Sequence, residues 1–227
     1  SVYALHPVYL HVEKVGKIKD KERKAYYEAR KAELNAKTFS DYQNVMNVKW
    51  EYFKEVYPTE SKAVFESTGY KAFFESNQQW LVPYAAFSYL RDLYKTPEFG
   101  KWPVYSNYNE NEIKELVDPA SGHFDEIAIY YFLQYHLHLQ LSEVHEYARA
   151  NGIAIKGDIP IGVSPRSVDA WVDPELFNSN VQAGAPPDDF SATGQNWGFP
   201  TYNWELMAKD GYQWWRKRFQ KLAEYFD

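Results

Sequence analysis

Apolar side chains recur at helical spacing over most of the chain. The pattern predicts helices at 20–36, 41–57, 61–76, 82–94, 111–117, 123–150 and 212–226. Ser40 is expected to cap the second of these helices and Pro58 to end it. Gly69 is expected to interrupt the third, and Pro83 to lie in the first turn of the fourth. The first half of the chain is therefore predicted to be mainly helical.

The longest periodic segment, 123–150, is followed directly by an apolar run. Gly152 lies where a left-handed residue would close the helix, and 153–163 then has the pattern of a buried strand. A helix, a continuous apolar strand and another helix are typical of a βα repeat in a parallel sheet. The apolar run 2–12 predicts a further strand, which should end near Pro7 because proline is poorly tolerated inside a central strand. These runs predict an α/β fold that is helix-rich overall.

The segment 184–205 differs from everything before it. It contains too many Gly and Pro residues for a helix or a paired strand, and too many aromatic residues for a solvated linker. A long ordered loop of this kind usually has a function. Flat aromatic faces beside Asp, Asn and Gln side chains suit a sugar, whose rings offer apolar C–H faces and a rim of hydroxyl groups.

Composition supports an aromatic-lined cleft and excludes several other classes of function. Aromatic residues make up 19% of the chain, more than a core of this size needs, although a Tyr-rich helical core would account for many of them. The net charge of -6, with no dominant basic face, argues against a nucleic-acid partner. No run is long enough to span a bilayer, and the N-terminus does not have the pattern of a secretory signal. The absence of cysteine excludes disulfides and thiolate metal sites, and it fits a cytoplasmic location.

Other catalytic patterns are missing. The chain has no metalloprotease-type His spacing, no glycine-rich phosphate loop and no nucleophile elbow around a serine. His138 and His145 fall on one face of the predicted helix without a third ligand, so a core or surface role is favoured. We therefore predict no metal and no cofactor.

Four ordered motifs within fifty residues carry a family resemblance. They are KGDIPIGV at 156–163, SVDAW at 167–171, GAPPD at 184–188 and GQNWG at 194–198. Together they closely resemble the 4-α-glucanotransferases (amylomaltase or disproportionating enzyme) of the α-amylase superfamily. One departure is 164–167 (SPRS), where the family more often has an acidic or aromatic residue before the serine.

The resemblance implies an incomplete slice of a (β/α)8 TIM-type barrel with a large helical insertion. Residues 1–16 would be the end of an early barrel strand and its loop, 17–122 the helical insertion, and 123–227 the βα portion with a substrate-binding loop. In such barrels function gathers at the C-terminal ends of the strands. Residues 164–171 and the loop up to 203 would lie at that face. A slice of this kind would expose strand edges, so poor solubility, self-association or attachment to a longer chain is expected.

The resemblance also implies an activity. Family members transfer α-1,4-glucan segments between maltooligosaccharides by double displacement, which requires two carboxylates about 5–5.5 Å apart. Their nucleophile lies in an Arg-Ile-Asp-His-like strand directly after the helix that matches 212–226. We therefore expect no catalytic carboxylate within 1–227, a fragment that is inactive alone, and the remainder of the same enzyme chain as its partner.

The expected substrate-binding residues are Asp158, Ser164, Asp188, Gln195, Asn196 and Trp197. Asp158, buried in the predicted strand, would either lie beside a sugar subsite or the nucleophile, or serve as an internal tie of the barrel. Asp188 would bind a sugar hydroxyl or stabilise its turn. Gln195 is expected to donate or accept hydrogen bonds to the substrate, and Trp197 to stack on a glucose ring.

Two other classes of function remain open. One is a non-catalytic maltooligosaccharide-binding module, although such modules are usually compact β-sandwiches and the long helices argue against it. The other is a helical interaction domain, which would leave the segment 157–205 unexplained. Titration with maltooligosaccharides separates these two classes.

Overall fold

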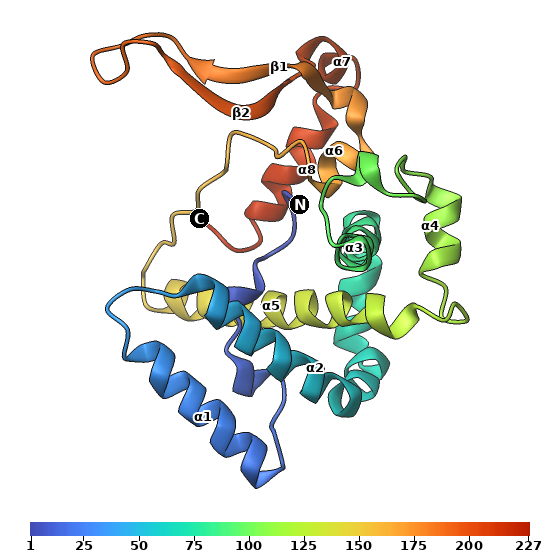
Figure 1. Ribbon diagram of the computed structural model, residues 1–227, viewed down its shortest axis with the longest axis vertical. Helices are drawn as coiled ribbons and strands as arrows, with labels where there is room; N and C mark the ends of the chain where they lie inside the picture. Colours follow the sequence, from blue (N-terminus) through green and yellow to red (C-terminus); the bar gives the residue numbers. More distant parts are fainter.

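The computed structural model describes residues 1–227, and more than half of them are helical (Figure 1). The α-helices are α1 (Lys21–Asn35), α2 (Tyr42–Glu66), α3 (Thr68–Tyr94), α4 (Glu110–Leu116), α5 (Phe124–Ala150), α6 (Val168–Val172), α7 (Trp204–Lys209) and α8 (Gln213–Leu222). Short 3-10 helices occupy Pro7–Tyr9, Val12–Lys14, Phe99–Lys101 and Pro174–Leu176. The strands β1 (Phe177–Ala185) and β2 (Gln195–Tyr202) form a two-stranded antiparallel sheet.

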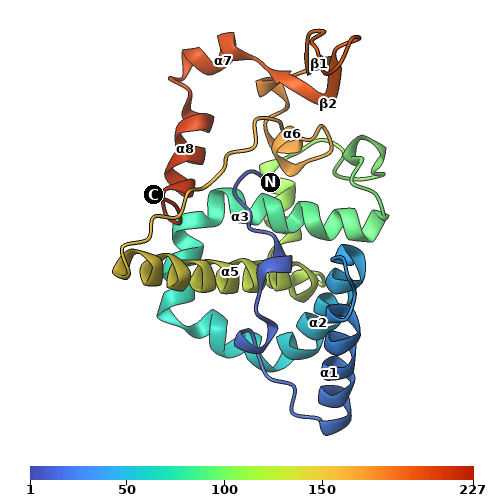
Figure 2. The same cartoon turned by 90° about the vertical axis from the view of Figure 1, so that its left-hand side faces the viewer.

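The main apolar core forms where α2, α3 and α5 pack together. Both views place α5 between α3 and α2 (Figures 1 and 2). Every residue from Ile127 to Leu137 is buried, so this part of α5 is covered all round. Phe53 of α2, Leu81 of α3 and Phe132 of α5 are all fully buried in this core. The predicted helix 123–150 is therefore confirmed, and it is the central element of the helical body.

Two prolines lie inside helices, where the sequence pattern had predicted helix ends. α2 continues through Pro58 to Glu66, and α3 contains Pro83. A proline in a helix interior costs about 3 kcal/mol, because one backbone hydrogen bond is lost and the ring crowds the preceding turn. Apolar burial on both sides outweighs that cost: Val56 is 1% exposed just before Pro58, and 85–90 is buried throughout just after Pro83.

The boundary between α2 and α3 lies at Ser67 and not at Gly69. The Ser67 hydroxyl oxygen accepts a hydrogen bond from the amide of Tyr70, as an N-cap does. Gly69 lies within the first turn of α3, where a Cβ atom would come 2.5 Å from the hydroxyl oxygen of Tyr135. This glycine is therefore a site of close approach to α5 and not a break. The N-cap of α2 is Asp41, one residue after the predicted Ser40.

The strand predicted at 153–163 is absent. The segment is extended, but no strand lies beside it, and a ladder requires a hydrogen-bonded neighbour. Ile155 instead exchanges two hydrogen bonds with Asp227, at 3.0 and 3.1 Å. The apolar composition of this segment is therefore not accompanied by the pairing that would make it part of a parallel sheet. Gly152, with φ +70°, closes α5 as predicted.

The strand predicted at the N-terminus is also absent. Pro7 begins a 3-10 helix, and the preceding residues run across α5 (Figure 2). The Gln134 side-chain amide accepts from the Leu5 amide at 3.0 Å and donates to the Leu5 carbonyl at 2.8 Å. One glutamine therefore satisfies both backbone groups that a neighbouring strand would have paired.

The segment predicted to be an unpaired loop, 184–205, contributes instead to the hairpin. Its Gly residues serve the pairing: a Cβ on Gly184 would lie 2.1 Å from the backbone oxygen of Gln195, and Gly194 has φ +74°. Pro200 lies opposite Gln182 where the register of the ladder is irregular. The prediction is wrong because Gly and Pro, which usually interrupt strands, lie here at close approaches and at an irregular point of the ladder. The hairpin extends beyond the helical body at the top of Figure 1.

A smaller apolar cluster holds the base of the hairpin. It consists of Val163, Ala170, Phe177, Tyr202, Met207 and Trp214. The cluster joins the end of the extended segment to both strands and to α8. None of the helices combines the length and apolarity needed to cross a membrane.

Candidate functional site

A cavity of about 620 Å³ lies between the extended segment and strand β2. One wall comes from 160–165 and the other from 197–199. Two of the six predicted binding residues, Ser164 and Trp197, are brought together here although they lie far apart in the sequence. The apolar cluster at the base of the hairpin holds the two walls near each other, because Val163 of the extended segment and Tyr202 of β2 both belong to it.

Trp197 presents a partly open aromatic surface at this cavity. Its side chain is 45% exposed, and its ring centre lies 5.8 Å from that of Phe199. The indole N–H donates to the side-chain oxygen of Gln195 at 3.0 Å, which restricts the orientation of the ring. A flat apolar face with a fixed orientation is suited to the C–H face of a sugar ring.

A glycine allows the two walls to approach. A Cβ on Gly162 would lie 2.5 Å from the ring of Phe199, closer than real contacts permit. The Phe199 ring therefore lies directly against the backbone of the extended segment. Phe199 was not among the predicted site residues. Its position two residues after Trp197 on one strand is the signal that a correct strand prediction would have supplied.

Asp158 is exposed and not buried in a strand as predicted, and its contact with a sugar stays a prediction. Its side chain makes no hydrogen bond within the chain, and the strand expected around it is absent. It lines a larger cavity, of about 1200 Å³, on the other side of the extended segment. Ser164 lines both cavities, so the segment 160–164 is the wall between them.

The other three predicted residues lie along the hairpin and do not line the 620 Å³ cavity. Asp188 accepts hydrogen bonds from the amides of Phe190 and Ser191, at 2.9 and 2.7 Å, and so adopts the turn alternative. Asn196 donates to the Gln182 side chain across the ladder at 2.6 Å. Gln195 supports the indole of Trp197. Contact of these residues with a sugar stays a prediction.

A separate cleft of about 560 Å³ between α3 and α8 contains a perturbed carboxyl group. Burial, followed by the nearby carboxylates of Glu175 and Asp169, raises the pKa of Asp173 to about 6. No group of three or more His, Asp or Glu side chains is placed to hold a metal ion.

Asp173 should make stability depend on pH. Because the pKa of Asp173 is raised in the folded protein, its contribution to the free energy of unfolding is most favourable below pH 4. That contribution is lost as the pH rises toward 6. We expect Asp173→Asn to stabilise the protein at pH 7 by about 1 kcal/mol after allowance for solvent screening, and to have no such effect at pH 4. Urea unfolding at the two pH values measures this, with Asp189→Asn on the exposed hairpin tip as the control. An equal effect of Asp173→Asn at both pH values would contradict the assignment.

Comparisons with known proteins agree with the motifs. The family description 4-alpha-glucanotransferase matches residues 1–227. The rice (Oryza sativa subsp. japonica) 4-alpha-glucanotransferase DPE2 is 44% identical over 231 residues, which cover 100% of this chain and 24% of the rice protein. The 4-alpha-glucanotransferase of Chlamydia pneumoniae is 31% identical over 100% of this chain and 42% of its own length. The chain thus spans a quarter to less than half of these relatives.

Solved structures share the fold. Amylomaltase from Streptococcus agalactiae, determined in complex with acarbose, superposes with a TM-score of 0.69 at 24% identity and covers 100% of this chain and 46% of that one. Amylomaltase from Corynebacterium glutamicum gives a TM-score of 0.73 at 20% identity, covering 100% of this chain and 31% of that one. With the motifs, the match over the whole chain and these folds in agreement, the chain belongs to the 4-alpha-glucanotransferase family.

Proposed function

We propose that this chain is the part of an α-retaining 4-α-glucanotransferase that grips an α-1,4-glucan. The observation that carries the proposal is the cavity between Ser164 and Trp197, in which an oriented indole faces a hydroxyl-bearing wall. The family membership and the printed names of the relatives support the same substrate class.

In this proposal the reaction is a double displacement between maltooligosaccharides. A carboxylate nucleophile would form a covalent glucosyl enzyme, and a second sugar hydroxyl would then accept the glucosyl group. The catalytic carboxylates would come from outside residues 1–227, and this chain would orient the glucose units beside them. Trp197 and the hairpin that carries it would lie over the bound sugar and favour a sugar acceptor by excluding water.

The same proposal covers the wider architecture. The chain would be a slice of a (β/α)8 barrel, with 1–16 near an early strand, 17–122 as a helical insertion and 123–227 as the barrel portion. Within the complete protein, 153–163 would acquire the strand neighbours that it lacks here. The partners would be α-glucans and the remainder of the enzyme, with no nucleic acid and no membrane. The location would be cytoplasmic.

Trp197→Ala tests the function. Removing the stacking face is expected to weaken maltohexaose binding by the complete natural polypeptide about tenfold, because a buried aromatic contact of this kind is worth about 1–2 kcal/mol. Isothermal titration measures the affinity, and disproportionation of maltotriose measures transfer. Trp204→Ala is the matched control, since Trp204 is similarly exposed, at 51%, but does not line the cavity. Equal losses in the two variants, or none in either, would contradict the proposal.

A further inference from the structure

The helical body contains a cleft that the proposed function does not use. It has a volume of about 1090 Å³, at the upper end of the range for ligand sites, and lies between α2, the end of α3 and the start of α5. Its walls come from all three helices and include Trp50, Lys54, Arg91, Asp92 and Tyr130. The cleft shares no residue with the cavity between Ser164 and Trp197.

Contacts within the helical body set the shape of this cleft. Three of its lining side chains, Tyr89, Ile129 and Tyr130, belong to the main apolar core. None of its walls comes from the extended segment 153–163 or from either end of the chain. The strand neighbours that the proposed function gives to 153–163 in the complete polypeptide therefore leave the elements that form this cleft unchanged.

Trp50 supplies an aromatic surface in the cleft. Its indole is half-buried, and edge-to-face contacts hold it against two rings, with centres 6.1 Å from Phe53 and 5.5 Å from Tyr130. The indole N–H makes no hydrogen bond within the chain. An aromatic ring of fixed orientation with a free donor is suited to a sugar, which offers an apolar face and hydroxyl acceptors.

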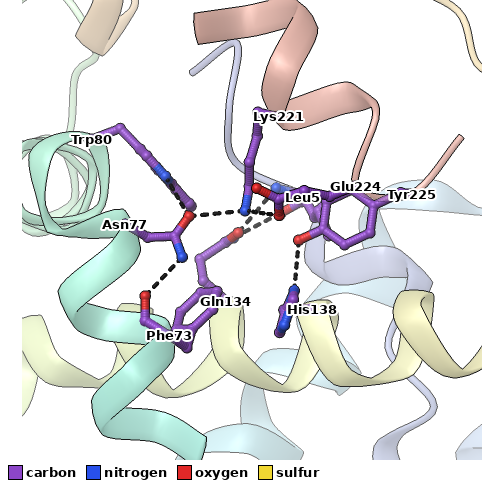
Figure 3. Close-up of polar contacts among 9 residues, drawn as sticks. All are labelled: Leu5, Phe73, Asn77, Trp80, Gln134, His138, Lys221, Glu224 and Tyr225. Atoms are coloured by element: carbon purple, nitrogen blue, oxygen red, sulfur yellow. Dashed lines mark hydrogen bonds and ion pairs between the residues drawn. The ribbon is translucent and has the colours of Figure 1, made fainter.

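Trp80, which lines the 560 Å³ cleft between α3 and α8, differs in this respect. Figure 3 shows its indole N–H directed at the Asn77 side-chain oxygen, to which it donates at 2.9 Å. The same oxygen accepts from Lys221 at 2.8 Å, and Lys221 also donates to Glu224. These polar groups bind one another and fix α8 to α3, a structural role that needs no ligand. The comparison favours the cleft at Trp50 as the binding site.

An oriented pair of charged side chains lies in the same cleft. The Asp92 carboxylate accepts from Nε of Arg91 at 2.8 Å and from the buried Tyr130 hydroxyl at 2.5 Å. The phenol thus orients the carboxylate, and the carboxylate orients the guanidinium. The two Nη groups of Arg91 make no hydrogen bond within the chain, and each carboxylate oxygen retains a lone pair. Donors and acceptors side by side match adjacent sugar hydroxyl groups, each of which both donates and accepts.

The charges around the cleft favour a neutral ligand. Three cationic side chains line it together with three carboxylates: Lys54, Arg91 and Lys95 with Asp92, Asp125 and Glu126. The formal charges cancel, so a phosphate or another anion gains no net attraction. A neutral polyhydroxyl ligand fits both the charge balance and the aromatic surface.

We propose that this cleft is a second binding site for α-1,4-glucan. Trp50 contacts the face of a glucose unit, and Arg91 with Asp92 binds its adjacent hydroxyl groups. The site retains polymeric glucan on the protein and so raises the local concentration of glucan at the cavity between Ser164 and Trp197. The choice of glucan as ligand rests on the proposed function, whereas the position of the site rests on the cleft itself.

Affinity electrophoresis tests the site, because glycogen in a native gel slows any protein that binds it. In the complete natural polypeptide, we expect Trp50→Ala to weaken the apparent affinity for glycogen about fivefold through the lost aromatic contact, and Arg91→Met about threefold through lost hydrogen bonds. Arg30→Met is the matched control, because Arg30 also pairs with a carboxylate, that of Glu33, and does not line the cleft. Unchanged affinity in Arg91→Met, or an equal loss in Arg30→Met, would overturn the inference.

Transfer from maltotriose, measured on the same variants, separates this cleft from the cavity at Trp197. The ratio of glycogen affinity to maltotriose transfer should fall in Trp50→Ala and not in Trp197→Ala. A matching loss of both quantities in Trp50→Ala would contradict a separate site. If the unmodified polypeptide transfers no maltotriose, the proposed function fails. If it transfers maltotriose but is not slowed by glycogen, the second site alone fails.

The melting temperature of each variant shows whether it folds. Trp50→Phe keeps a ring against Phe53 and Tyr130, and it should lose about twofold in glycogen affinity. If Trp50→Ala does not fold, Arg91→Met decides the result, because the Arg91 side chain is 39% exposed and lies outside the apolar core.

Discussion

Phe132→Ala is expected to lower the free energy of unfolding by about 3–5 kcal/mol, because it leaves a cavity at the centre of the helical body. Phe132 is fully buried, and its ring lies 5.4 Å from that of Tyr57 and 4.5 Å from that of His136. These neighbours come from α2 and from the next turn of α5, which cannot move into the space without losing their own contacts. Urea unfolding followed by circular dichroism measures the loss.

The matched control is Phe39→Ala, which removes the same ring from a side chain that is 67% exposed. That change should alter the free energy of unfolding by less than about 0.5 kcal/mol. A similar loss in both variants would mean that α5 is not the centre of the core.

The protein should also lose stability as the pH falls from 7 to 5, by about 2 kcal/mol through one histidine. Burial lowers the pKa of His136 to about 4, and its Nε2 atom is buried without a partner. Because the folded pKa lies below the unfolded value, the contribution is fully present above about pH 6.5 and is lost as the pH falls toward 4. Stability is lost because the His136 side chain takes up a proton when the protein unfolds.

His136→Leu should remove this part of the pH dependence, since leucine fills a similar volume and carries no proton. Unfolding in urea at pH 7, 6 and 5 gives the slope for each protein. His11→Leu is the control, because His11 is exposed. If the slope of His136→Leu equals that of the unmodified protein, His136 is not buried in its neutral form.

Helical periodicity was a reliable guide to the helical body, while local breaker residues were not. The segments around α1, α4 and α5 were predicted to within a few residues, because their capping and apolar patterns are local. Pro58 and Pro83 misled the prediction, since tertiary burial on either side outweighs the local cost of proline. That burial involves residues distant in the sequence, which no window of local sequence contains.

The sheet and the site depend still more on distant contacts. The run 153–163 has the composition of a strand, but composition does not supply a neighbour. Ser164 and Trp197 could be selected from their chemistry, whereas Phe199 became visible only once β2 was seen as a strand.

The two hydrogen bonds between the Gln134 side chain and the Leu5 backbone have a consequence for synthesis on the ribosome. The two residues are separated by 129 positions, so the backbone groups of Leu5 emerge long before their partner exists. At about 5–20 residues per second, the early segment waits for several seconds or more before it can dock. Until then the segment is apolar and undocked, and the Leu5 amide and carbonyl have no partner within the chain. In that state a nascent chain is most open to chaperones and to association with neighbouring chains on a polysome.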